Sequence, residues 1–394
     1  MRATLAVLFL INVLNFYDRQ ALGAVVEPLR HEFHLTDQQL GAIPTAFVIV
    51  YALAGVPLGR LADRWSRKRL LALGVSVWAA LTALGGASTG YGMLFVTRLG
   101  VGVGEAVCAP AATSWIGDIV PPHGRSRALA GFMMAVPVGI MLSFVVSGPA
   151  AQAFGWRMAL TLAAAPALLL VPALLFVPEP LRHKKSAGQM TAASLLRIPA
   201  LWWITLSGAI ANFIMYSFSY FIAAFLTRFH GMSVAQAGVW SGLGSGAAGM
   251  AGALTVVAIG GRLRLAAAAA LLATPLAWIA IRLPQGEARG AIALLMLAYG
   301  LWQMYYGPVY AAIQDIVPPE LRATAMSMYF LAMYLCGGAF GPLILGTLSD
   351  RFARIAGGGE AGRAAGLHEA MYVIPLMSAA LAVVLWAGDR ARAR

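Results

Sequence analysis

The stretch that decides the fold is GRLADRWSRKRLL, Gly59 to Leu71, a short basic segment between two apolar runs at residues 39–58 and 70–88. Each run has about 20 residues, which is enough to cross a hydrocarbon core as a helix. Five Lys and Arg residues lie within residues 59–69, and short basic loops of this kind stay on the cytoplasmic side of a membrane. The segment therefore predicts a membrane hairpin with a cytoplasmic turn.

The same pattern continues in both directions along the chain. Of the 394 residues, 60% are hydrophobic and 11% are charged, compared with roughly 25% charged in a soluble domain. The apolar runs predict an all-α integral membrane protein of twelve transmembrane helices, at residues 4–27, 39–58, 70–88, 92–114, 128–149, 158–178, 200–225, 237–259, 265–283, 291–314, 324–347 and 370–387.

The distribution of basic residues gives the expected topology. With the N-terminus inside, 18 Lys and Arg residues fall on the cytoplasmic side and eight on the other side, which predicts that both termini are cytoplasmic. The net charge of +13 does not indicate a nucleic-acid partner, because the basic residues lie between the spans instead of forming one stripe.

A repeat at half the chain length indicates two similar halves. The segment DIVPPHGRSRA from Asp118 matches DIVPPELRATA from Asp315 at seven of eleven positions, and the offset of 197 is half of 394. We therefore expect an N-terminal six-helix bundle (1–178), a cytoplasmic linker (179–199) and a C-terminal six-helix bundle (200–394), related by pseudo-two-fold symmetry. Repeats of this kind place a substrate site near the bilayer midplane, between the halves.

Four ionisable residues lie inside predicted spans, where charges are costly and commonly functional. Asp18 and Arg19 follow Asn15 in span one, and Arg98 and Glu105 lie on one face of span four. At about 1.5 Å per residue, Asp18 and Arg98 lie at similar depths, and Arg19 points toward a different partner, for which Glu105 is the candidate. The cluster predicts proton coupling, and the alternative is a static ion-pair lock between the two spans.

The second half offers polar and aromatic residues in place of charges. A cavity that is charged in one half and aromatic in the other suits an amphipathic solute, although the tyrosines can equally serve packing or an interfacial aromatic belt. The predicted cavity residues, besides Asn15, are Asn212, Tyr216, Gln303, Tyr306 and Tyr310.

The basic loop itself is a candidate gate, formed by Gly59, Asp63, Arg64 and Arg67. Asp63 can face the positive N-terminal end of a neighbouring helix and so lock one conformation. For the basic residues the alternative is that they only enforce topology. The equivalent loop of the second half, which starts at Gly260, lacks the acid.

Taken together, these motifs resemble a known family. The 59–71 loop resembles the signature loop of the major facilitator superfamily. With NFYDRQAL in span one, TRLGVGVGEA in span four, and YYGPVYAAIQDIVPPELRATA and GPLILGTLSD in the second half, the chain looks like the bacterial branch of the spinster family. The resemblance covers nearly the whole chain. It implies the major facilitator fold, a bacterial inner membrane, export or flipping of lysophospholipids or sphingoid lipids, and Asp18, Arg19, Arg98 and Glu105 as the polar cluster.

We therefore expect a secondary active transporter that works by alternating access, coupled to the proton gradient, with an amphipathic small molecule and membrane lipids as its partners. We expect a monomer without cofactor or metal. An anion:cation symporter for small organic anions is the neighbouring alternative, which a ring of arginines would favour. An enzyme or receptor is the alternative of another class, but all six histidines lie in predicted loops and no zinc-spaced cluster occurs.

Overall fold

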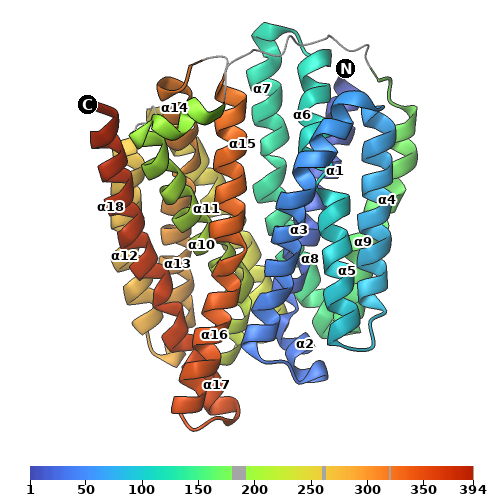
Figure 1. Ribbon diagram of the computed structural model, residues 1–394. Helices are drawn as coiled ribbons and strands as arrows, with labels where there is room; N and C mark the ends of the chain where they lie inside the picture. The colour runs from blue at the N-terminus through green and yellow to red at the C-terminus, as the bar shows by residue number, and fades with distance from the viewer. Residues whose placement is uncertain (180–191, 260–262, 319–320, 394) are drawn as a thin grey trace. The chain divides into compact units, whose positions relative to one another are not determined.

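A computed structural model describes residues 1–179, 192–259, 263–318 and 321–393 (Figure 1). The elements of these residues are all helical, which confirms the all-α prediction. The helices of the first half are α1 (Arg2–Ala24), α2 (Val26–Phe33), α3 (Asp37–Arg64), α4 (Arg67–Gly86), α5 (Tyr91–Glu105), α6 (Cys108–Ile119), α7 (Pro122–Met133), α8 (Ala135–Phe154) and α9 (Trp156–Phe176).

The second half continues the same architecture after a short 3-10 helix, Ala192–Arg197. Its helices are α10 (Pro199–Arg228), α11 (Val234–Ile259), α12 (Leu263–Arg282), α13 (Ala288–Gln303), α14 (Tyr306–Ile316), α15 (Arg322–Ala332), α16 (Phe340–Ile355), α17 (Gly359–Met371) and α18 (Val373–Ala393). A second 3-10 turn precedes α13, at Gln285–Glu287, and a π-helical turn, Met333–Gly338, joins α15 to α16.

Nine helical segments of the described residues are long and apolar enough to cross a membrane. Several helices extend beyond the predicted spans, because a helix does not end where the hydrocarbon does. The expectation that all histidines lie in loops is consequently wrong for His31, His123 and His368, which lie in α2, α7 and α17. His183 lies outside the described residues.

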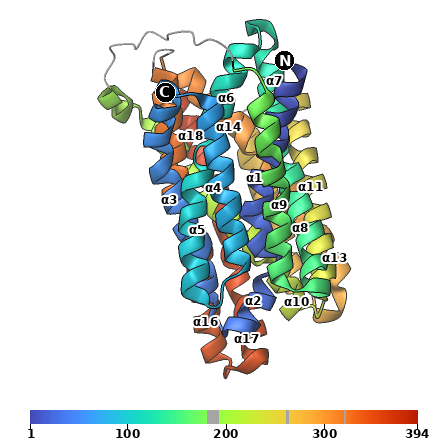
Figure 2. The same cartoon turned by 90° about the vertical axis from the view of Figure 1, so that its right-hand side faces the viewer.

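Contacts group the chain into two compact units. The first contains Met1–Leu35, Ala46–Lys185 and Met232–Leu243, and the second contains Thr36–Thr45, Ser186–Gly231 and Gly244–Arg394. In the first unit, α4 packs against α5 and α9, as Figure 2 shows, and α1 packs against α8. In the second unit, α12 packs against α13 and α18, and α10 packs against α18.

Glycines allow helices of the first unit to approach at backbone distance. A Cβ atom on Gly104 of α5 would lie 2.9 Å from the backbone nitrogen of Trp78 and 3.0 Å from the carbonyl oxygen of Gly74, both in α4. A Cβ atom on Gly102 would lie 2.8 Å from the carbonyl oxygen of Phe47 in α3. The small residues of span four therefore serve close packing, which is their usual role between membrane helices.

Helix interruptions occur at repeat-related positions in the two halves. The helix through span four breaks at Ala106–Val107, between α5 and α6, and the helix through span ten breaks at Met304–Tyr305, between α13 and α14. The offset of 197 that relates Asp118 to Asp315 also carries Val107 onto Met304. Discontinuous helices in corresponding positions of two repeats commonly mark the binding region of a transporter.

The repeated DIVPP motif folds alike in both halves. The Arg125 guanidinium donates to the carbonyl oxygen of Val120 over 3.5 Å, and the Arg322 guanidinium donates to that of Val317 over 3.3 Å. Each arginine thus reaches back to the carbonyl that ends the preceding helix.

The first aspartate of the motif, in contrast, has acquired different surroundings in the two halves. Asp118 pairs with the buried Arg67 of α4 at 2.5 Å, with side-chain exposures of 16% and 6%. Asp315 pairs with Arg392 at 3.2 Å, and these side chains are 67% and 31% exposed.

This difference predicts unequal effects of the same substitution. Asp118→Asn leaves the Arg67 charge uncompensated in a buried site, which costs about 3–5 kcal/mol of stability. Asp315→Asn removes an exposed pair worth at most about 1 kcal/mol. In detergent, the thermal unfolding midpoint should fall clearly for Asp118→Asn and change little for Asp315→Asn. Equal decreases in the unfolding midpoint would contradict the difference in burial between the two ion pairs.

A second prediction concerns the α4–α5 crossing. Gly104→Ala forces the two backbones apart and should lower stability by about 1–3 kcal/mol, measured as the same unfolding midpoint. Gly92→Ala is the matched control on α5, since no described residue beyond its own helix turn comes within 4 Å of its added Cβ. If Gly104→Ala left the unfolding midpoint as unchanged as the control does, the close approach of the α4 and α5 backbones would be contradicted.

Candidate functional site

The four predicted ionisable residues form two buried ion pairs in the first unit. Arg19 Nε lies 2.7 Å from Glu105 Oε2, with side-chain exposures of 5% and 0%. Arg98 Nη1 lies 3.3 Å from Asp18 Oδ2, with exposures of 3% and 1%. Helix α1 supplies one acid and one base, and α5 supplies the other two. These are the pairs that the helical spacing indicates, whereas their part in proton coupling stays a prediction.

Arg19 also lies against two aromatic rings of span two and one of its own helix, which the sequence did not indicate. Its guanidinium carbon is 4.2 Å from the ring centroid of Tyr51, 5.4 Å from that of Phe47 and 4.8 Å from that of Phe16. Cation–π contacts of this kind stabilise a guanidinium in a site with little water. Phe47 and Tyr51 are one turn apart on α3 and stack at 5.9 Å, but no sequence spacing links them to Arg19.

Hydrogen-bonding capacity in this cluster exceeds what the described residues use. The Nε and Nη2 atoms of Arg98 and the amide nitrogen of Asn15 have no hydrogen-bond partner among the described residues, although all are buried. Asp18 is also an electrostatic neighbour of Glu105. Two acids and two bases balance in charge, so an added proton or anion would change which pairs are held.

Of the six residues predicted to line a cavity, five lie in the second unit and one, Asn15, lies in the first. In the second unit, the Tyr306 and Tyr310 rings lie 5.9 Å apart on α14. Gln303 donates to the hydroxyl of Tyr299 over 3.1 Å, and Tyr216 meets Tyr334 edge to face at 6.3 Å.

The two predicted asparagines are both buried. Asn212 donates over 3.3 Å to the carbonyl oxygen of Gly208, one turn back on its own helix. Asn15 belongs to the charged cluster of the first unit.

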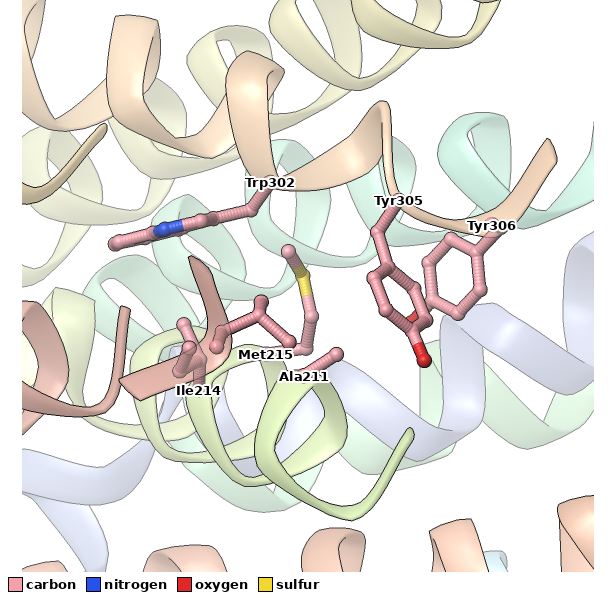
Figure 3. A pocket seen from close by; sticks show the side chains of 7 residues that line it. Ala211, Ile214, Met215, Trp302, Tyr305 and Tyr306 are labelled. Carbon is pink, nitrogen blue, oxygen red and sulfur yellow. The ribbon is translucent and has the colours of Figure 1, made fainter. Parts of the chain in front are cut away.

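The second unit contains a narrow, largely apolar pocket, shown in Figure 3, which has no room for a water molecule in this structure. Its walls come from α10, from the α13–α14 interruption and from α18, and its lining residues are Ala211, Ile214, Met215, Trp302, Tyr305, Tyr306 and Leu381. Of the predicted cavity residues, Tyr306 is in this lining.

A buried hydroxyl network beside the cavity was not predicted. The Tyr305 hydroxyl lies 2.8 Å from Ser207 Oγ and 2.9 Å from the Tyr329 hydroxyl. Tyr305 occupies the α13–α14 interruption, so the network ties the break to α10 and α15. The three residues lie far apart in the sequence, so no sequence spacing connects them. The adjacent tyrosines at 305 and 306 are the one local feature that could have drawn attention to this position.

The predicted gate loop is fastened within the first unit. Besides its pair with Asp118, Arg67 donates its backbone N–H to Glu179 over 2.6 Å, and Ser66 donates its hydroxyl to the other Glu179 oxygen over 2.5 Å. Lys68 donates in return to the carbonyl oxygens of Leu175 and Val177, over 3.1 Å each.

The remaining gate residues are less informative. Gly59 lies in α3, and only Pro110 comes within 4 Å of a Cβ atom built on it. The side chains of Asp63 and Arg64 lie outside the described residues. A gating role of this loop therefore stays a prediction. Among the described residues, no group of His, Cys, Asp and Glu side chains could hold a metal ion.

Comparison with known proteins gives the family. The model of the Major Facilitator Superfamily matches residues 8–342. An "MFS-type efflux pump" of Mycolicibacterium smegmatis is 34% identical over 376 residues, which cover 92% of this chain and 87% of that protein. "Protein spinster homolog 1" of Xenopus tropicalis is 26% identical over 390 residues, covering 88% of this chain and 73% of that protein.

Solved structures agree with this assignment. The crystal structure of a bacterial homolog to the human lysosomal transporter Spinster, in an inward-facing and unoccupied conformation, matches with a TM-score of 0.87 and 25% identity, and covers 98% of this chain and 96% of that one. The D-xylose-proton symporter matches with a TM-score of 0.81 at 17% identity, which shows the fold alone. The chain has the major facilitator fold of twelve membrane helices in two six-helix bundles, is a transporter and not an enzyme, and belongs to the major facilitator superfamily as a spinster-like member.

Proposed function

We propose that this protein is a proton-coupled secondary transporter that moves an amphipathic solute, such as a lysophospholipid or a sphingoid lipid, by alternating access. The observation that carries the proposal is the pair of buried ion pairs, Arg19–Glu105 and Arg98–Asp18. Each charge in a membrane interior is costly. Stability alone does not account for these residues, because apolar residues of similar volume are often as stabilising as a buried ion pair.

The geometry supplies a proton-dependent exchange of partners. When Glu105 takes up a proton, it loses its charge and the charge-assisted hydrogen bond from Arg19 weakens. The Arg19 guanidinium then remains held by the Tyr51 and Phe47 rings and presents its charge to an anionic head group. Loss of the proton restores the ion pair and displaces the head group, so solute binding and proton binding become linked.

The aromatic residues of the second unit support an amphipathic solute. The walls of its cavity are ring faces, methyl groups and a thioether, and the Trp302 nitrogen and Tyr305 hydroxyl are already engaged by Ser378 and Ser207. Walls of this chemistry are better suited to an alkyl segment than to a polar ligand, and the pocket would have to widen to admit one. An efflux pump and spinster proteins are among the relatives, which supports transport and does not name the solute.

The alternative is a symporter of small organic anions, which the two arginines of the cluster could bind. The aromatic and apolar character of the second unit favours the amphipathic solute. A static lock formed by the two ion pairs is the remaining alternative for the cluster, and it predicts transport without dependence on a proton gradient.

The cellular placement and the assembly of the protein are part of the proposal. We propose a bacterial inner membrane, both termini in the cytoplasm, a monomer, no cofactor, and residues 1–178 and 200–394 as the two moving bundles joined by the 179–199 linker. The excess of basic residues in the expected cytoplasmic loops supports this orientation.

The first test of function is flux of a labelled lysophospholipid into proteoliposomes, with and without an imposed pH gradient. We expect gradient-dependent flux in the wild type and loss of the gradient dependence, by about tenfold or more, in Glu105→Gln, because this variant cannot exchange the proton. Lysophospholipid flux that keeps its full pH dependence in Glu105→Gln would contradict the proton-coupling role of Glu105. Flux of a small organic anion without lipid flux would favour the alternative substrate class.

A second test separates ring contact from hydroxyl contact in the second unit. Tyr306→Ala and Tyr310→Ala should each lower lipid flux at limiting substrate by about tenfold, since a lost ring contact is worth about 1–2 kcal/mol. Tyr306→Phe and Tyr310→Phe are the matched controls and should keep most of the flux. If the Phe variants lost as much flux as the Ala variants, a polar solute would be indicated instead.

A further inference from the structure

Two serines of the second unit hold the polar ends of two side chains that line its pocket. The Trp302 indole N–H donates to Ser378 Oγ over 2.8 Å, and the Tyr305 hydroxyl lies 2.8 Å from Ser207 Oγ. Both serines are fully buried, and neither belongs to the lining of the pocket. Trp302 and Tyr305 thus contribute their rings to the pocket while their hydrogen-bonding groups are bound outside the lining.

The direction of these hydrogen bonds follows from the single proton of each serine hydroxyl. Ser378 donates its proton to the carbonyl oxygen of Ala270 over 2.8 Å, and Ser207 donates its proton to that of Ile204 over 2.7 Å. A hydroxyl group has one proton and two lone pairs, so Ser207 Oγ must accept from the Tyr305 hydroxyl. A backbone carbonyl therefore keeps each serine in the role of acceptor toward its pocket wall.

Each serine lies one helical turn from a residue that lines the pocket. Ser207 precedes Ala211 by four residues on α10, and Ser378 precedes Leu381 by three residues on α18. Residues three or four apart share one face of a helix. Both serines therefore lie on the helix faces that border the pocket, next to the walls that Figure 3 shows.

The pocket disfavours a hydrogen-bonding group on an entering chain. Because it has no room for a water molecule in this structure, a hydroxyl group that entered would lose its hydration. The Trp302 N–H and the Tyr305 proton are already donated to the serines. A hydrophobic pocket discriminates by about 100-fold against a solute that adds one hydroxyl group.

The serines also determine which walls stay in place when the pocket widens. Trp302 and Tyr305 are each held by a hydrogen bond, whereas Met215 of α10, in the facing wall, carries no hydrogen-bond donor. Methionine is unbranched and has three rotatable bonds, so it adapts readily to a change of shape. Movement of Met215 can admit a chain while both serine contacts persist, and the widened pocket keeps its apolar surface.

We propose that Ser207 and Ser378 determine which chain end the second unit accepts. By keeping the Tyr305 hydroxyl and the Trp302 N–H bound, they make the pocket select a plain alkyl end over one that carries a hydroxyl group. This inference rests on the proposed amphipathic solute and specifies its chain end. Without Ser207 Oγ, the Tyr305 hydroxyl and the Ile204 carbonyl face the space of one oxygen atom, which the hydroxyl group of a solute can fill.

Equilibrium binding to the full chain in detergent, without a proton gradient, tests this selection. A radiolabelled lysophospholipid with a saturated chain is displaced either by the same unlabelled lipid or by its ω-hydroxylated analogue. The selectivity is the ratio of the two half-displacement concentrations, and in the wild type we expect the analogue to be about 100-fold weaker. Ser207→Ala and Ser378→Ala should each lower this ratio about tenfold. Micelle partition of the competitors is the same for every variant, so a change in the ratio reports the pocket.

A second substitution should restore the selectivity, which a merely structural role of Ser207 would not produce. Tyr305→Phe removes the freed donor and keeps the ring, so the double variant Ser207→Ala with Tyr305→Phe has an apolar wall again. Replacing both partners of a hydrogen bond leaves no unsatisfied group, in contrast to replacing one. The ratio of the double variant should therefore return to about the wild-type value.

Ser245→Ala is the matched control. Ser245 is a buried serine of α11 that lies 3.8 Å from the Met296 sulfur and is not part of the lining, so its replacement should leave the ratio unchanged. A wild type that does not bind the lysophospholipid, an unchanged ratio in both Ser207→Ala and Ser378→Ala, or a double variant as unselective as Ser207→Ala overturns the inference. Gradient-dependent lipid flux together with an unchanged ratio would remove the role of the serines and leave the proposed transport standing.

Discussion

An ionised side chain that is buried away from water needs a partner of opposite charge. This constraint determines which helices of the described residues lie together. Four ion pairs join helices that lie far apart in the sequence: two between α1 and α5, one between α4 and α6, and one between α10 and α3. Apolar side chains alone do not select between these helix pairings in lipid, because lipid tails are as apolar as leucine. The paired charges and the glycine crossings supply that selection.

The sequence predicted those features that depend on the helix repeat alone. The pairing of Asp18 with Arg98 and of Arg19 with Glu105 follows from a rise of about 1.5 Å and a turn of about 100° per residue. Glu179, Phe47 and the Ser207 network could not be predicted, since their partners lie across helix crossings whose angles no spacing encodes. The hydrogen bond of Asn212 to its own helix turn was not predicted either, since a polar residue in a span can bond within its own helix, and its place in a substrate cavity stays a prediction.

The two halves resemble one another more in backbone structure than in the side chains beside their helix breaks. The helix breaks at Val107 and Met304 and the arginines at 125 and 322 occupy corresponding positions. The first half has buried ionisable groups beside its break, while the second has Tyr305 and its hydroxyl partners. A duplicated scaffold can therefore carry different chemistry in its two copies, with buried charges in one and tyrosine and serine hydroxyl groups in the other.

The π-helical turn at Met333–Gly338 has a bearing on chain length. A turn closed by i→i+5 bonds holds one residue more than an α-helical turn, so everything after it is rotated by about 100° compared with a regular helix. Ser349 and Asp350 of α16 reach the first turn of α3, where both bond to Asp37, in this rotated register. A single-residue deletion within the turn would yield a more regular helix and simultaneously aim both side chains elsewhere. A change in the number of residues here would therefore move every contact of the helix that follows, whereas a substitution acts at its own position.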